Sequence, residues 1–422
     1  MTPTDARIHL FRAGSFPHVL VVDGSRIYEI DQETYRRLEA GELGLETSSY
    51  VTDEAPRTMP VRSLSLAIAQ KCNLGCTYCY AQEGAFGAEP KSMTREVALR
   101  AVDLLFSEAD PKEKLTLAFL GGEPLTNRPL LREAAETAAA MAAAQGIRIA
   151  FSITTNGTLI TPEDGEFFER YGFAVTVSLD GVGQAHDLLR PFKDGRGSYE
   201  RILRNVEPLL RMQRRMQVSA RVTVTPSNPA LRHTLDELLA RGFSSVGFTP
   251  MLASPTGLGQ MGAAELAAML QEMIACGLEC ERRILAGERY GFSNLVTALR
   301  ELHKGTHRPY PCGAAGSYFG VSADGELASC HRFVNDGAGK MGDVIQGVDR
   351  QAQRTWLEDR HVHRQSPCNE CWARYLCGGG CHHEVIHRGR PACDYIRGWL
   401  HYSLQAYARL LKLRPDYFAQ SN

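Results

Sequence analysis

Three cysteines lie within eight residues of one another, in the run Cys72-Asn73-Leu74-Gly75-Cys76-Thr77-Tyr78-Cys79. Thiolates at this spacing can reach one metal centre from a single loop, and they suit zinc or iron–sulfur centres. A structural zinc site needs a fourth local ligand to close its tetrahedron, yet the next histidine along the chain is His186. A 4Fe–4S cluster held by three cysteines instead leaves one iron open. The run therefore favours an iron–sulfur centre with an open coordination position.

A second set of seven cysteines falls in the last third of the chain: Cys312, Cys330, Cys368, Cys371, Cys377, Cys381 and Cys393. A zinc ribbon would use only those from Cys368 to Cys381 and would leave the other three without a role. The start of the chain lacks the apolar core of a signal peptide. Clustered cysteines in a reducing compartment seldom form disulfides, so the second set indicates further metal clusters.

Two of the twelve cysteines remain, Cys276 and Cys280, four residues apart in the predicted helix Met273–Glu281. That spacing places them on one helix face, where free cysteines behave as small buried apolar residues. The run His382-His383-Glu384 directly follows a cysteine of the second set. We interpret it either as a source of hydrogen bonds to a metal ligand or as ordinary surface.

The elements that position the first cysteines alternate between strand and helix patterns. Six apolar runs predict strands: Leu64–Ala69, Leu115–Leu120, Ile149–Thr154, Ala174–Leu179, Val218–Thr225 and Ser245–Thr249. Helical periodicity follows them in Met93–Ser107, Pro129–Ala144 and Ser198–Met212, and Thr161-Pro162 is a helix start. Six β-then-α units in succession imply a parallel sheet with right-handed crossovers. Six are too few for an eight-stranded barrel, so we expect an α/β fold with a partial (β/α)6 barrel and its chemistry at the C-terminal strand ends.

The two ends of the chain differ from this middle part. His18–Val22 and Arg26–Ile30 predict a hairpin around Asp23-Gly24-Ser25, followed by a helix over Asp31–Glu39 and a polar linker over Thr52–Pro60. Towards the C-terminus, glycine, cysteine and polar turns dominate until a closing helix at Tyr395–Leu413, so metal clusters would have to supply order there. The expected divisions are 1–60, 61–300 and 301–422.

Composition excludes several classes of function. The net charge is -1, with 44% hydrophobic and 23% charged residues, and no broad basic stripe suggests a nucleic-acid binder. No run of 18 or more apolar residues predicts a membrane span. We therefore expect a cytoplasmic protein with no nucleic-acid or membrane partner.

The first cysteine run, CxxxCxxC with Tyr78 before the last cysteine, resembles the signature of the radical S-adenosylmethionine (radical SAM) family. The resemblance implies that Cys72, Cys76 and Cys79 hold a 4Fe–4S cluster whose open iron is chelated by the amino and carboxylate groups of SAM. An electron from the cluster would then cleave SAM and release a 5′-deoxyadenosyl radical.

Motifs after successive predicted strands extend the resemblance. Gly121-Gly122-Glu123-Pro124 resembles the family's GGEP motif, in which Glu123 would hold the SAM ammonium and the glycines would allow close backbone approach. Asn156 and Ser178 would face the ribose or methionine portion of SAM, with Asp180 nearby. Each turn alone is commonplace, but their joint placement at successive strand ends favours a cofactor site.

Two later strands carry the remaining expected SAM contacts. Arg221 resembles the basic residue that meets the SAM carboxylate through a charge-assisted contact. Val246-Gly247-Phe248 lies where the family packs the adenine.

The second set of cysteines, with Gly325 between Cys312 and Cys330, resembles the SPASM extension of peptide-modifying radical SAM enzymes. It implies two auxiliary 4Fe–4S clusters, three clusters in all. Cys312, Cys330 and Cys381 would hold the inner one, and Cys368, Cys371, Cys377 and Cys393 the outer one. Fully ligated members have one more cysteine before Cys312, where this chain reads His303–Arg308 without one. His307 as a ligand, a surface histidine, and a substrate thiolate on the open iron are the alternatives.

The stretches Cys330-His331-Arg332-Phe333 and Lys340-Met341-Gly342-Asp343-Val344 look most like thioether-forming maturases. These act on the small subunit of quinohemoprotein amine dehydrogenase or on cysteine-rich ribosomal peptides. The resemblance implies a radical SAM/SPASM oxidoreductase that builds intramolecular cysteine thioethers in a cysteine-containing peptide or small protein subunit, with a reducing flavodoxin or ferredoxin as electron donor. Residues 1–60 would bind the peptide or cover the barrel.

Three alternatives remain. One is a sulfatase-maturase-like dehydrogenase that forms formylglycine; such enzymes place an acidic base after the cysteine matching Cys330, where this chain has His331. Another is a radical SAM enzyme that forms a different carbon–carbon or carbon–heteroatom cross-link in a peptide. The third is a non-catalytic iron–sulfur scaffold, which would have no use for a SAM pocket.

Overall fold

The computed structural model describes residues 6–45, 49–56 and 59–419, and the chain divides into two compact units. The sheet unit comprises Pro56–Met261 and Gly313–Leu357, and the helical unit comprises Met1–Ala55, Gly262–Cys312 and Glu358–Asn422. Each unit is assembled from separate stretches of sequence. The expected divisions at residues 60 and 300 remain a prediction about functional domains.

The sheet unit contains an 11-stranded sheet in the order β10-β9-β8-β7-β6-β4-β11-β12-β13-β14, with β5 beside β4. Its strands are β4 (Ser63–Gln70), β5 (Lys91–Ser92), β6 (Lys114–Gly121), β7 (Arg148–Thr155), β8 (Ala174–Ser178), β9 (Gln217–Val224), β10 (Ser245–Pro250), β11 (Tyr318–Val321), β12 (Glu326–Ala328), β13 (Lys340–Asp343) and β14 (Gly347–Val348). Its helices are α2 (Arg95–Ser107), η1 (Pro124–Asn127), α3 (Arg128–Gln145), α4 (Pro162–Tyr171), α5 (Gln184–Leu189), α6 (Tyr199–Met212), α7 (Leu231–Ala240), η2 (His331–Phe333) and η3 (Gly337–Gly339); α10 (Arg350–Arg360) crosses into the helical unit.

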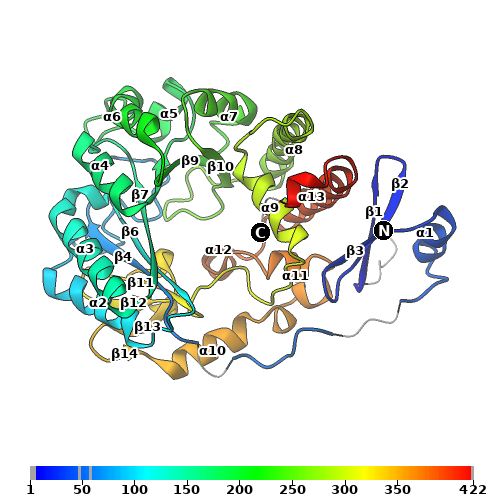
Figure 1. Cartoon of the computed structure of the whole chain (residues 1–422), viewed down its shortest axis with the longest axis horizontal. Helices are drawn as coiled ribbons and strands as arrows, with labels where there is room; N and C mark the ends of the chain where they lie inside the picture. The colour runs from blue at the N-terminus through cyan, green and yellow to red at the C-terminus, as the bar shows by residue number, and fades with distance from the viewer. Residues whose placement is uncertain (1–5, 46–48, 57–58, 420–422) are drawn as a thin grey trace. The chain divides into compact units, whose positions relative to one another are not determined.

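The six predicted strands correspond to β4 and β6–β10, and these run parallel. Helices α2 to α7 surround them on the outside (Figure 1). β4 lies next to β6, and all its residues after Ser63 are buried, as expected for a parallel strand covered on both faces. Thr161 begins α4 with a capping box, as its sequence predicts. The predicted partial α/β barrel is therefore confirmed.

Residues 313–357 add four strands that the sequence pattern does not predict. β11 pairs in parallel with β4, and β12, β13 and β14 follow as antiparallel neighbours. Each has two to four residues, too few for an alternation of apolar and polar side chains to be recognised. This part of the cysteine-rich region therefore continues the barrel sheet.

The helical unit contains a three-stranded antiparallel sheet and several helices: β1 (Ile8–Ala13), β2 (Phe16–Val21), β3 (Arg26–Glu29), α1 (Gln32–Glu39), α8 (Ala263–Leu285), α9 (Ser293–His303), η4 (Val362–Arg364), η5 (Cys368–Glu370), α11 (Arg374–Cys377), α12 (His382–Arg388), α13 (Cys393–Leu413) and α14 (Asp416–Ala419). The predicted hairpin, first helix and closing helix correspond to β2–β3, α1 and α13. β1 is an addition.

α8 and α13 pack through a buried polar contact. Glu281 accepts hydrogen bonds from Tyr402 (2.6 Å) and from Arg409 (2.9 and 2.8 Å), so its buried charge is paired. Cys276 and Cys280 are fully buried in α8, as interpreted from their spacing. In the described part of the chain, no helix is long and apolar enough to cross a membrane.

Candidate active site

The three cysteines of the first run lie in a loop, residues 72–79, that follows β4. Burial raises the pKa of Cys76 to about 12, and the neighbouring thiols of Cys79 and Cys72 act in the same direction. Burial also raises the pKa of Cys72. These mutual influences place the three thiols together. Three convergent thiols without a fourth local ligand fit a 4Fe–4S cluster with one open iron, and binding it would require their deprotonation.

Glycines allow this cysteine loop to pack against the end of β6. A Cβ on Gly84 would lie 2.6 Å from the Cα of Gly122 and 3.0 Å from the Cβ of Cys72. Gly84 and Gly121 also have positive φ angles of 92° and 145°, which L side chains rarely adopt. Packing thus requires glycine at these positions of the predicted GGEP motif, independently of SAM. Without side chains, the two loops can meet by backbone contact.

Glu123 is fully buried directly after these glycines. Its Oε1 accepts hydrogen bonds from Leu125 N (3.0 Å) and Thr155 Oγ1 (2.8 Å), and its Oε2 accepts one from Asn156 N (2.7 Å). Burial raises its pKa, and the three donors oppose that effect. A carboxylate accepts about four hydrogen bonds, so one further donor, such as an ammonium, fits. Pro124, also buried, begins η1.

We expect Glu123→Gln to separate the structural and ligand-binding roles of Glu123. It keeps the shape of the side chain and loses the charge, so SAM binding should weaken by about 1.5–3 kcal/mol, the value of a charge-assisted hydrogen bond. Glu123→Ala leaves three donors unpaired and should also lower the free energy of unfolding by about 2–4 kcal/mol. Equilibrium dialysis and denaturant unfolding under anaerobic conditions measure the two effects. Unchanged SAM affinity in Glu123→Gln would remove this carboxylate from the cofactor site.

Asn156 is also buried, and its side chain reaches the cysteine loop. Its Nδ2 donates to Asn73 Oδ1 (2.9 Å) and lies 3.6 Å from Cys72 Sγ, while its Oδ1 accepts from Thr158 N (2.9 Å). The side chain thus supports the cysteines, and its predicted contact with SAM remains a prediction.

Ser178 is the last residue of β8, and it pairs in register with Arg221 in the middle of β9. Arg221 is exposed and stands opposite Gly247 of β10. The pairing places the two residues side by side on neighbouring strands, with Ser178 at the strand end where chemistry is expected in such folds. Their contacts with SAM, and that of the adenine with residues 246–248, remain predictions.

Asp180 and Tyr78 belong to a buried polar triad that includes Arg190, which sequence reasoning missed. Tyr78 OH donates to Asp180, Arg190 Nη1 donates to Tyr78 OH (2.7 Å), and Arg190 lies 3.5 Å from Asp180 Oδ2. Asp180 Oδ1 also accepts from Thr223 N (2.8 Å). Tyr78 therefore points to a protein carboxylate. The only sequence signal for Arg190 is its place shortly after the Ser-Leu-Asp-Gly turn.

The segment after Cys330 lies beside the cysteine loop within the sheet unit. The rings of Tyr80 and His331 are 6.2 Å apart, and the Arg332 guanidinium lies 5.4 Å from the centroid of the Tyr80 ring. His331 Nδ1 is 2.8 Å from Tyr318 OH, and burial lowers the pKa of His331 to about 4. The residue at the position of the expected acidic base is thus a half-buried imidazole within hydrogen-bonding distance of a tyrosine hydroxyl.

The four cysteines predicted to hold the outer cluster come together in the helical unit. Burial raises the pKa of Cys368 to about 11, and Cys377, Cys393 and Cys371 raise it further. The backbone N–H groups of Gly379 and Gly380 donate to Cys377 and lower its pKa, an arrangement possible because Gly378, Gly379 and Gly380 all have positive φ. Four convergent thiols with N–H donors fit a 4Fe–4S cluster. Their role as ligands remains a prediction.

The inner cluster is not tested by the structure, because Cys330 belongs to the sheet unit and Cys312 and Cys381 belong to the helical unit. His307 Nδ1 lies 3.0 Å from Ser25 Oγ, and its ring is 4.0 Å from that of Tyr375. These neighbours explain the position of His307 without a metal, and its role as a ligand remains a prediction.

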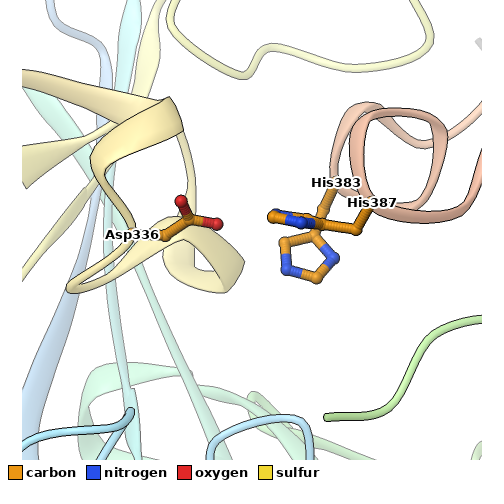
Figure 2. A group of neighbouring side chains, drawn as sticks. All are labelled: Asp336, His383 and His387. Carbon is orange, nitrogen blue, oxygen red and sulfur yellow. The ribbon is translucent and has the colours of Figure 1, made fainter. Parts of the chain in front are cut away.

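The histidines that follow Cys381 lie on α12. His382 is buried, and burial lowers its pKa to about 4. His383 and His387, one turn apart, have ring centroids 4.5 Å apart, and Figure 2 shows their imidazoles side by side. Asp336, also labelled in Figure 2, belongs to the sheet unit. It caps the start of η3, where its Oδ1 accepts a hydrogen bond from Ala338 N (3.0 Å).

Comparison with known proteins agrees with this geometry. Residues 66–238 match the family model described as Radical SAM superfamily. The serine-type anaerobic sulfatase-maturating enzyme of Klebsiella aerogenes is 25% identical over 357 residues, which cover 81% of this chain and 85% of that protein. The cysteine-type enzyme of Clostridium novyi is 34% identical over 158 residues, 36% of this chain and 41% of that protein.

A solved structure titled "Native anSMEcpe with bound AdoMet and Cp18Cys peptide" has a TM-score of 0.69 at 20% identity, covering 85% of this chain and 99% of that one. It shows the same fold. Together, these findings show that the chain is similar to radical SAM proteins over residues 66–238 and to sulfatase-maturating enzymes over most of its length. The thioether-forming type expected from the sequence is not confirmed, and the relatives lie closer to the formylglycine alternative.

Proposed function

We propose that this chain is a radical SAM oxidoreductase that oxidises a residue of a peptide or small protein substrate. The observation that carries the proposal is the gathering of Cys72, Cys76 and Cys79 beside Glu123 and Asn156 at the C-terminal strand ends. Bound on a reduced cluster there, SAM would supply a radical able to take a hydrogen atom from an unactivated carbon. The cysteine-containing peptide and the flavodoxin or ferredoxin donor belong to the proposal.

Formylglycine formation is the first candidate reaction, because two relatives that match 81% of this chain are sulfatase-maturating enzymes of Klebsiella species. A substrate cysteine would lose one hydrogen atom from Cβ, one proton from its thiol and one electron to become a thioaldehyde, which water would then hydrolyse to formylglycine with release of hydrogen sulfide. The electron would leave through the auxiliary clusters. Cys330, a predicted ligand of one of them, lies near Tyr80 in the sheet unit.

Thioether formation is the second candidate, and it has the same balance of one hydrogen atom, one proton and one electron. The observation in its favour is His331, which stands where formylglycine-forming enzymes are expected to place an acidic base. The ring of His331 lies within hydrogen-bonding distance of Tyr318 OH. The replacement of the acidic base by histidine is therefore accommodated by a neighbouring side chain. Here the sulfur of a substrate cysteine would bond to the carbon that lost its hydrogen.

Reaction of the reconstituted enzyme with cysteine-containing peptides, followed by mass spectrometry, tests the proposal. Release of 5′-deoxyadenosine together with a modified peptide is the expected result. An aldehyde at the former cysteine identifies formylglycine formation. A product lighter by two hydrogens per link, whose thiols resist alkylation after reduction, identifies a thioether, since a disulfide would return to free thiols. Reductive SAM cleavage that no added peptide stimulates, with every peptide unchanged, would contradict the proposal.

A further inference from the structure

The cysteine loop is paired with a second segment, residues 189–192, which follows α5. Two backbone hydrogen bonds join them: Gly75 N to Pro191 O (2.9 Å) and Thr77 N to Leu189 O (3.1 Å). Leu74 and Phe192 continue this pairing as an antiparallel bridge. The two hydrogen bonds flank Cys76 on one side and Arg190 on the other. Cys76 and Arg190 therefore stand opposite each other by backbone register.

Arg190 is held in place from several sides. Its side chain is 12% exposed, Nη1 donates to Tyr78 OH (2.7 Å), and the guanidinium lies 3.5 Å from Asp180. Its Nε is buried and has no hydrogen-bond partner among the residues that the structure describes, which is unusual for a charged donor. The backbone register thus places this restrained cation opposite Cys76.

We propose that Arg190 is a positioning residue that fixes a positive charge beside Cys76 and raises the reduction potential of the cluster held by the cysteine loop. Reduction adds one negative charge to a cluster, and a nearby buried cation stabilises that state. Asp180 restrains the guanidinium and partly offsets its effect. The inference rests on the iron–sulfur cluster of the proposed function.

Arginine, lysine and glutamine at position 190 separate charge from shape. Arg190→Lys keeps a cation but not the planar fork, whereas Arg190→Gln removes the charge. Asp180→Asn removes the opposite charge with an isosteric side chain. Arg196→Gln is the matched control, because Arg196 is an exposed arginine of the same region that pairs with Asp194.

Redox titration followed by electron paramagnetic resonance, reading the signal that SAM perturbs, measures the potential in anaerobically reconstituted full-length protein. We expect Arg190→Gln to shift it to a more negative value and Asp180→Asn to shift it to a more positive one. Arg190→Lys should remain near the wild type, and Arg196→Gln should not change it. Opposite shifts of the potential in Arg190→Gln and Asp180→Asn would indicate an electrostatic role. A mere loosening of the cysteine loop would shift the potential in the same direction in both variants.

An unmoved potential in Arg190→Gln, or a shift of the same sign in both variants, would overturn the inference. If Arg190→Gln loses its iron, Asp180→Asn decides: a more positive potential supports the inference and any other result overturns it. A wild-type protein with no SAM-perturbed signal would instead overturn the proposed function itself.

Discussion

Replacement of Cys72, Cys76 and Cys79 by alanine is expected to abolish SAM cleavage and to remove about four irons per chain, the content of one 4Fe–4S centre. The three thiols converge in one loop, and the sheet unit has only one other cysteine, Cys330. No alternative set of thiols there could hold the cluster. Iron analysis of anaerobically reconstituted protein and assay of 5′-deoxyadenosine after dithionite reduction measure the two losses.

Cys276→Ala serves as the control for this experiment. It also removes a buried thiol, but from α8 in the helical unit, so iron content and SAM cleavage should stay near the wild-type values. If the triple variant kept its full iron content, the cysteine loop would not be a cluster site. If it lost the iron and still released 5′-deoxyadenosine, SAM would be cleaved elsewhere.

The sequence predicts the sheet well where long apolar strands carry it. β4 and β6–β10 have five to eight residues each, and strands buried on both faces produce apolar runs that stand out. β11–β14 do not stand out, because their two to four residues find their partners only through long-range pairing with β4 and one another. The assembly of each unit from separated stretches could not be predicted for the same reason. It depends on long-range contacts, which leave no periodicity in the sequence.

The candidate site shows a similar division between local and long-range information. Cysteine spacing identifies the thiols, and the structure brings both predicted local sets together. The packing role of Gly122 could not be predicted in this way. Its close approach to Gly84 joins two loops that are distant in sequence. Arg190 is likewise recognisable only once backbone pairing sets it opposite Cys76. Residue type and spacing predict ligands, whereas the groups that position those ligands require the fold.

Replacement of Cys371 and Cys377 by serine is expected to remove about four irons per chain, the content of one further 4Fe–4S centre, and to leave reductive SAM cleavage in place. Both thiols lie in the helical unit beside those of Cys368 and Cys393, whereas the cysteine loop belongs to the sheet unit. Because metal binding contributes folding free energy where regular structure is short, residues 361–392 should also become sensitive to protease. Iron analysis and limited proteolysis measure these effects.

Cys280→Ser is the matched control for this pair, because Cys280 is a buried cysteine of the same unit whose Sγ lies 3.7 Å from Tyr290 O and which belongs to neither predicted cluster set. It should keep the wild-type iron content. The outer cluster would be contradicted if the wild-type protein contained zinc and the Cys371/Cys377 variant lost that zinc without losing iron. This result would identify a zinc ribbon over Cys368–Cys381. Loss of iron together with loss of substrate oxidation but not of SAM cleavage would place this centre after the hydrogen-abstraction step, because an oxidation that removes one electron needs an acceptor while the initial cleavage does not.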